Sequence, residues 1–149
     1  QFIRKVREGG LKSILLSVSF VGADPLVGEL GSDGNGVIVT QVVPHYDSDL
    51  PIALDFRESM DHSQLTFGAF EGYITTRILA EALYKLDQDP TQENVIASLE
   101  KLGVFNIGLG VPLKITPEEH QASHMVWPTI LMDGKVLPFT WDMLANYHD

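Results

Sequence analysis

The chain has 149 residues, a formal charge of −10 and no cysteine. Its length allows one domain with a sizeable core, and its composition, 44 % hydrophobic and 20 % charged, is that of a folded globular protein. The acidic balance argues against nucleic acid and anionic membrane surfaces as partners, because like charges repel. The lack of cysteine excludes disulfides, thiol catalysis and cysteine-ligated metals, and it fits the cytoplasm and the bacterial periplasm equally well.

The first half of the chain alternates between helix and strand patterns. Residues 1–8 predict the end of an amphipathic helix, and the apolar run at 14–20 predicts a buried strand. Asp24, followed by a proline, is typical of a helix N-cap and predicts a helix to about residue 30. The β-branched run at 37–43 predicts a second strand. This order implies an α/β fold with parallel strands and crossover helices.

Three helices and a β-rich end follow. Apolar spacing predicts helices at about 50–60, 66–86 and 91–102, the last with Asp89 as its cap. Short strands are expected around Asp133-Gly134, a hairpin-turn signal, and the tail from Trp141 to Asp149 is expected to be a short helix or disordered. This order suggests that the chain leaves one sheet, builds against another and returns.

Several segments carry a resemblance to a known family. They are SVSFVGADPL at 17–26, GVIVTQVVP at 36–44, FEGY at 70–73 with AEAL at 80–83, the helix at 91–102, and HQAS at 120–123. Their order and spacing resemble the second half of type I periplasmic binding proteins, the family of branched-chain amino-acid binding proteins. The resemblance implies two α/β lobes of parallel sheets flanked by helices, with a small ligand bound between the lobes at the carboxyl ends of the strands.

The resemblance also implies a division of the chain. Residues 1–41 would finish the second lobe, 42–103 would hold a crossover and first-lobe helices, and 104–149 would hold the last crossover and the terminal strands. Val42, Val43 and Pro44 would form a hinge for lobe closure. The chain would then be a C-terminal fragment, covering well under half of a family member. Alone it is expected to bind ligand weakly, and its uncovered sheet edges invite self-association or a partner fragment.

The implied function is extracytoplasmic, and in bacteria periplasmic, binding of an amino acid or a related small organic acid. The ligand would be delivered to an inner-membrane ABC permease, and the alternative is the ligand-sensing domain of a signalling receptor. No cofactor or metal is implied. An enzyme is not expected, because no nucleophile elbow or triad pattern stands in the sequence.

The expected ligand-binding residues are Ser19, Phe20 and Val21, at the end of the first strand. Relatives that bind leucine tend to place an acidic residue at the position of Ser19, where it meets the ligand ammonium group. A serine hydroxyl hydrogen-bonds but carries no charge, which favours a ligand other than a standard α-amino acid. Phe20 would pack against an apolar ligand or, alternatively, belong to the strand core.

Two further patterns have a structural alternative. His120 and His124 stand four residues apart, after Glu118 and Glu119, which on a helix could hold a metal. Pro117 instead favours a turn, with both histidines as solvated loop residues. Gly72 lies inside a predicted helix, where glycine is unfavourable, and we expect close packing of another backbone to account for it.

Overall fold

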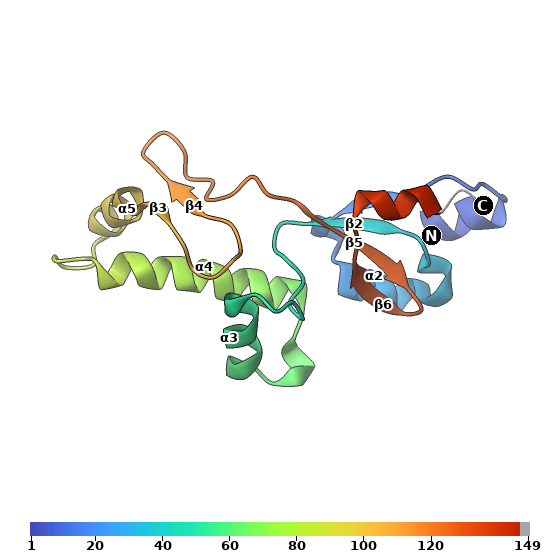
Figure 1. Cartoon of the computed structure of the whole chain (residues 1–149), viewed down its shortest axis with the longest axis horizontal. Coiled ribbons are helices and arrows are strands. Elements are labelled where there is room, and N and C mark those ends of the chain that lie inside the picture. Colours follow the sequence, from blue (N-terminus) through green and yellow to red (C-terminus); the bar gives the residue numbers. More distant parts are fainter. Residues whose placement is uncertain (147–149) are drawn as a thin grey trace. The chain divides into compact units, whose positions relative to one another are not determined.

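The computed structural model describes residues 1–146, and the chain divides into two compact units (Figure 1). One unit, here the sheet unit, holds Gln1–His45 together with the chain from Val126 onward. The other, the helical unit, holds Tyr46–Met125. Within residues 1–146, no helix combines the length and the apolar character that crossing a membrane would require.

The sheet unit contains a four-stranded sheet in the order β1-β2-β5-β6. The strands are β1 (Leu16–Val18), β2 (Ile38–Gln41), β5 (Trp127–Met132) and β6 (Lys135–Pro138). The first two are parallel, as predicted, and α2 (Ala23–Leu30) connects them. The other two pairs are antiparallel, so the chain returns to the first sheet after building the helical unit.

The core of the sheet unit is centred on β2, which has hydrogen-bonded neighbours on both sides. Ile38 and Val39 are fully enclosed, with at most 1 % exposed. The buried Thr129 hydroxyl donates to the Val39 carbonyl at 2.8 Å, and the buried Gln41 amide donates to that hydroxyl at 3.4 Å. The two buried polar side chains of this core, Gln41 and Thr129, therefore form a hydrogen-bonded pair, which limits the free-energy cost of burying them.

The β5–β6 hairpin turns at Asp133-Gly134, as the sequence predicts. Both residues have positive φ, 49° and 72°, which matches the right-handed twist of the flanking strands. The Asp133 amide donates to the Asn35 side-chain oxygen at 2.8 Å, and the Asn35 amide donates back to the Asp133 carboxylate at 3.3 Å. This reciprocal pair ties the hairpin to the loop before β2.

Short helices complete the sheet unit. These are α1 (Phe2–Glu8) and the 3-10 helices η1 (Ser19–Val21), η2 (Gly31–Gly34) and η4 (Trp141–Asn146). No residue of α1 is buried. The predicted tail is thus partly helical, and its last three residues lie outside the described part of the chain.

The helical unit holds the three predicted helices and a small hairpin. Its elements are α3 (Pro51–Ser59), η3 (His62–Gln64), α4 (Phe67–Tyr84), α5 (Gln92–Lys101), β3 (Gly103–Phe105) and β4 (Leu113–Ile115). Phe56 and Phe70 are 0 % exposed, and their ring centroids lie 4.9 Å apart, so aromatic packing joins α3 to α4. The ring of Tyr73 also packs against Phe56, with 5.4 Å between the two ring centroids.

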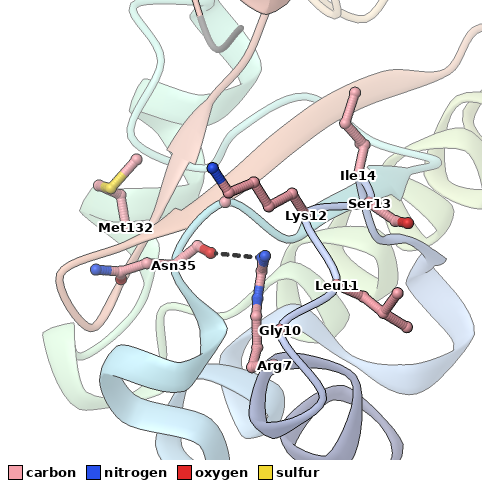
Figure 2. A pocket seen from close by; sticks show the side chains of 9 residues that line it. Arg7, Gly10, Leu11, Lys12, Ser13, Ile14, Asn35 and Met132 are labelled. Atoms are coloured by element: carbon pink, nitrogen blue, oxygen red, sulfur yellow. Dashed lines mark hydrogen bonds between the residues drawn. The ribbon is translucent and has the colours of Figure 1, made fainter. Parts of the chain in front are cut away.

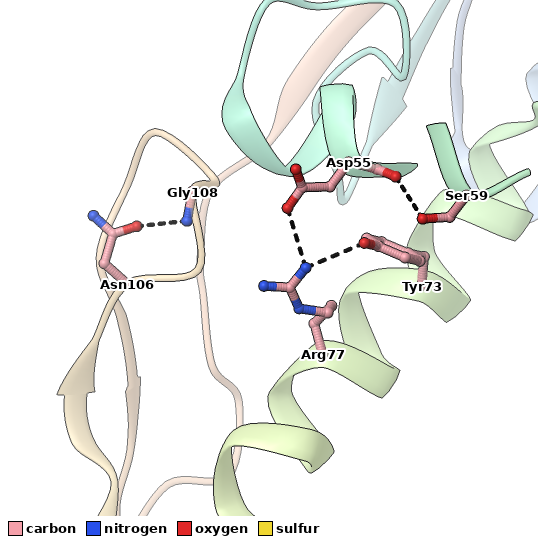
Figure 3. A network of polar contacts seen from close by, with 6 residues as sticks. All are labelled: Asp55, Ser59, Tyr73, Arg77, Asn106 and Gly108. Carbon is pink, nitrogen blue, oxygen red and sulfur yellow. Dashed lines mark hydrogen bonds and ion pairs between the residues drawn. The ribbon is translucent and has the colours of Figure 1, made fainter. Parts of the chain in front are cut away.

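A glycine loop closes over the start of α3. The Gly108 carbonyl accepts a hydrogen bond from the Ile52 amide at 3.3 Å, and the Asn106 side chain accepts one from the Gly108 amide at 2.8 Å (Figure 3). Gly108 has φ +83°, and a Cβ there would meet Pro51 Cβ at 3.0 Å. Both the positive φ and this close approach require glycine.

A polar cluster lies beside the aromatic core of the helical unit (Figure 3). Arg77 donates to the Tyr73 hydroxyl and to the Asp55 carboxylate, each at 3.2 Å. These two partners, the tyrosine first, raise the pKa of Arg77 above its ordinary value. The cluster connects α4 to α3 at the surface, where such an ion pair contributes little to stability.

The helix starts differ from the predictions in detail. Asp24 is not the cap of α2, because the helix already begins at Ala23 behind Gly22. Asp89 does not cap α5 either, since the Thr91 hydroxyl accepts from the Asn94 amide at 3.3 Å. In both places two candidate caps stand within three residues, and local sequence does not decide between them.

Two other predictions were wrong. The strand expected at 14–20 is shorter, and its ends are not buried, with Leu16 and Val18 each 54 % exposed. The cause is that β1 is an edge strand with a neighbour on one side only. The backbone packing expected around Gly72 is absent too, because a Cβ there would meet nothing within 4 Å in the described structure.

Candidate ligand-binding site

The predicted site lies where the two parallel strands end. In the register of the sheet, Val18, the last residue of β1, stands opposite Thr40 on β2, so Ser19 directly follows the end of β1 and Gln41 is the last residue of β2. The hydroxyl of Thr40 donates across to the Ser17 carbonyl at 3.4 Å, and η1 contacts β2. The carboxyl ends of parallel strands are where open α/β sheets bind ligands.

The predicted residues form the short helix η1 rather than the end of a strand. The Gly22 amide donates to the Ser19 carbonyl at 2.8 Å, which closes the turn, and Gly22 takes φ +76° to lead into α2. Phe20 is 96 % exposed and Val21 52 %. The alternative that Phe20 belongs to the strand core is therefore wrong, because the chain leaves the extended conformation at Ser19.

Exposed apolar residues from other segments lie at the same edge. Val42 follows β2 and is 49 % exposed, and Val126 precedes β5 and is 54 % exposed. These segments are neighbours because Gln41 is paired with Trp127 across the two strands. Sequence reasoning missed Val126, since only this long-range pairing brings it to the edge. We call Phe20, Val21, Val42 and Val126 the apolar edge.

The polar groups at this edge are few. Residues 16–30 and 36–44 contain no lysine or arginine, so these segments offer a ligand carboxylate no fixed positive charge. Pro25 has no N–H to donate in the first turn of α2, and Asp24 places a negative charge there. An anionic group would therefore depend on Ser19 and backbone amides, whereas the apolar edge suits an uncharged, aliphatic ligand body.

The predicted hinge lies next to the division between the two units. Val42 is half exposed, whereas Val43 and Pro44 are buried. The ring nitrogen Nε2 of His45 lies 2.9 Å from the Val136 carbonyl oxygen, a hydrogen bond that holds the end of the segment to β6. The division follows directly after His45, and the hinge role of the three residues stays a prediction.

The two histidines are exposed loop residues, as predicted. His120 pairs with Glu100 at 2.9 Å and His124 with Glu119 at 2.7 Å, so each ring faces a different carboxylate. Their side chains are 62 % and 67 % exposed. In the part of the chain that the structure describes, no three side chains of the types that ligate metals stand together.

Comparison with known proteins identifies the family. The family model for a periplasmic binding protein matches residues 1–135, so the chain belongs to the periplasmic binding protein family. This confirms the resemblance and the α/β fold class predicted from the sequence. No protein with a curated function matches the chain.

Solved structures show the same fold. A possible leucine/isoleucine/valine-binding protein from Rhodopirellula baltica SH 1 is 42 % identical with a TM-score of 0.90, over 95 % of this chain and 40 % of that one. An extracellular ligand-binding receptor from Verminephrobacter eiseniae is 26 % identical with a TM-score of 0.74, over 90 % and 40 %. A leucine-binding protein from Thermotoga maritima MSB8 is 20 % identical with a TM-score of 0.77, over 93 % and 40 %. The chain thus spans about two fifths of the length of these relatives.

Proposed function

We propose that the apolar edge and Ser19 form one wall of a site for a small organic ligand in an extracytoplasmic binding protein. The observation that carries the proposal is Phe20, a phenylalanine 96 % exposed at the carboxyl end of a parallel strand. Exposing a large aromatic ring to water is unfavourable, and a ligand that covers it recovers that free energy. The role is binding without catalysis or cofactor, and the whole protein delivers its ligand to an inner-membrane ABC permease.

The ligand class is a small aliphatic acid or amino acid. The relative at 42 % identity is described as a possible leucine/isoleucine/valine-binding protein, which supports an aliphatic body. The valines of the apolar edge fit such a body. Ser19 offers hydrogen bonds but no negative charge, so an ammonium group on the ligand gains little from this residue.

Calorimetry on the whole protein tests this class with a matched pair of ligands. Leucine and 4-methylpentanoate share the aliphatic body and carboxylate, and only leucine has the ammonium group. The proposal predicts that 4-methylpentanoate binds at least as tightly as leucine. Ser19→Asp should reverse this order, because a carboxylate attracts the ammonium and repels the anion. If neither leucine nor 4-methylpentanoate binds, the proposed ligand class is contradicted.

A pair of variants tests the position of the site. Phe20→Ala should weaken binding of the tighter ligand about tenfold or more, because the ligand loses its apolar contact with the ring that it would cover. Tyr84→Ala is the matched control, since Tyr84 is an aromatic residue 91 % exposed in the helical unit. Equal dissociation constants for the two variants would place the ligand elsewhere.

The division into lobes is part of the same proposal. We infer that the sheet unit belongs to one lobe and the helical unit to the other, with Val42, Val43 and Pro44 as the hinge between them. The supporting observation is that the chain passes between compact units directly after this segment. Because affinity would depend on both lobes, the 149-residue chain should bind at least about tenfold more weakly than the whole protein. Equal affinities would contradict a two-lobed site.

The open side of β1 is proposed as a surface for pairing with another segment or copy. Leu16 and Val18 are each 54 % exposed on this edge strand, without the charges that usually protect an edge. Analytical ultracentrifugation of the 149-residue chain should show association that rises with concentration. Val18→Lys should suppress it, and a monomer at all concentrations would contradict the proposal.

A further inference from the structure

A hollow lies in the sheet unit at the opposite end of the parallel strands, by the amino ends of β1 and β2 (Figure 2). Its walls come from the end of α1, the loop before β1, the loop before β2 and the end of β5. The cavity volume is about 540 Å³, within the range of about 300–1,000 Å³ that is usual for small-molecule sites. It shares no residue with the apolar edge.

The charged residues that line this hollow are both basic, while the nearby Asp133 carboxylate accepts a hydrogen bond from the lining residue Asn35 at 3.3 Å. Arg7 and Lys12 line it, and none of its lining residues, all within residues 1–146, is acidic. Arg7 Nη2 donates to the Asn35 carbonyl at 3.1 Å, which holds the guanidinium in place and leaves its other N–H groups for a ligand. Among the described residues neither Arg7 nor Lys12 pairs with a carboxylate, whereas Arg4 on the same helix pairs with Asp33 at 3.0 Å.

Apolar side chains stand beside the two cations. Leu11 and Ile14 line the hollow with 57 % and 48 % exposed, and Met132 lines it from β5. Figure 2 shows Arg7 reaching up from α1 and Lys12 extending from the loop that also carries Leu11 and Ile14. Cations next to exposed apolar groups match a ligand with one anionic end and an apolar body.

We propose that this hollow binds a small carboxylate with an apolar body, separately from the ligand of the apolar edge. The carboxylate lies between Arg7 and Lys12, and the body covers Leu11, Ile14 and Met132. The chain as a whole carries a charge of −10 and repels anions. Binding of a carboxylate here therefore depends on the local cations and not on the general charge of the protein.

Nuclear magnetic resonance on the ¹⁵N-labelled 149-residue chain tests the proposal, with octanoate as the probe. Saturable shift changes are expected at the amides of Gly10, Leu11, Lys12, Asn35 and Gly36. Octan-1-ol, which lacks the charge, and inorganic phosphate, which lacks the apolar body, should each bind at least about threefold more weakly. The shifts locate the probe, so failure here and failure of the proposed function are distinguishable.

A matched pair of variants decides whether the cation matters. Lys12→Met keeps the apolar stem and should weaken octanoate about threefold or more. Lys5→Met makes the same change at an exposed position of α1 outside the hollow and should leave the dissociation constant unchanged. Equal dissociation constants for the two variants, or shifts confined to other residues such as Ser19, Phe20 and Val21, would overturn the proposal.

Discussion

Two phenylalanines of the helical unit and Phe20 of the sheet unit lie in opposite surroundings, although the sheet unit also buries Phe139 and the helical unit also exposes Tyr84. In the helical unit Phe56 and Phe70 are fully buried against each other, and a surface cluster around Arg77 satisfies the nearby polar groups. In the sheet unit Phe20 and Phe2 are 96 % and 73 % exposed. The aromatic rings of α3 and α4 therefore contribute to stability, whereas the exposed ring of Phe20 contributes little.

The contrast between buried and exposed phenylalanines predicts a large difference in the stability of their alanine variants. Phe56→Ala should lower the free energy of unfolding of the helical unit by about 3–5 kcal/mol, because a large cavity replaces a fully buried ring. Phe20→Ala should change stability by no more than about 0.5 kcal/mol, since its ring contacts mostly water. Urea unfolding followed by circular dichroism measures both. Similar losses for the two variants would remove the contrast.

A smaller effect is expected where a loop closes on α3. Gly108→Ala should destabilise the helical unit by about 1–3 kcal/mol, because its φ of +83° and the nearby Pro51 exclude a side chain. Gly72→Ala is the matched control, since it lies in α4 with open space around it. That variant should gain about 0.5–1 kcal/mol from helix propensity. Thermal unfolding compares them, and a destabilised Gly72→Ala would show a contact that the structure lacks.

The smallest effect concerns the polar cluster. Arg77→Met should cost at most about 1 kcal/mol, because its ion pair with Asp55 is exposed to solvent. The side chains of the pair are 37 % and 53 % exposed, so added salt should lower the stability of the wild type slightly and leave that of the variant unchanged. Urea midpoints at low and high salt measure this. A loss as large as that for Phe56→Ala would mean that the cluster, not the aromatic core, holds α3 to α4.

The sequence predicted the helical unit better than the sheet unit, for a physical reason. The helices α3, α4 and α5 follow from apolar spacing over many residues, and the errors there concern the cap at Asp89 and the packing expected around Gly72. Where β1 ends depends on its neighbours, and from the apolar run at 14–20 alone the strand was expected to continue through Phe20. The position of the strand end decides that Phe20 faces water, and the sequence alone left open whether this residue faces a ligand or belongs to the strand core.

The residues of the candidate site also differ in whether the sequence could predict them. Ser19, Phe20 and Val21 were predicted from the resemblance to a family and from the order of strands. Val126 stands more than a hundred residues from them in the sequence. It reaches the edge only through the pairing of Gln41 with Trp127, and local patterns contain no information about that register.

Hydrogen–deuterium exchange on the whole protein, with and without the ligand that binds most tightly, tests whether the apolar edge is the ligand-binding site. We expect slower exchange at the amides of residues 19–22 and 42–43, where the ligand would cover the apolar edge. Residues 10–14 lie at the opposite end of the parallel strands. Their exchange should not change at ligand concentrations that just saturate the site at the apolar edge. Protection that leaves residues 19–22 unaffected would contradict the assignment of Phe20 to the ligand-binding site.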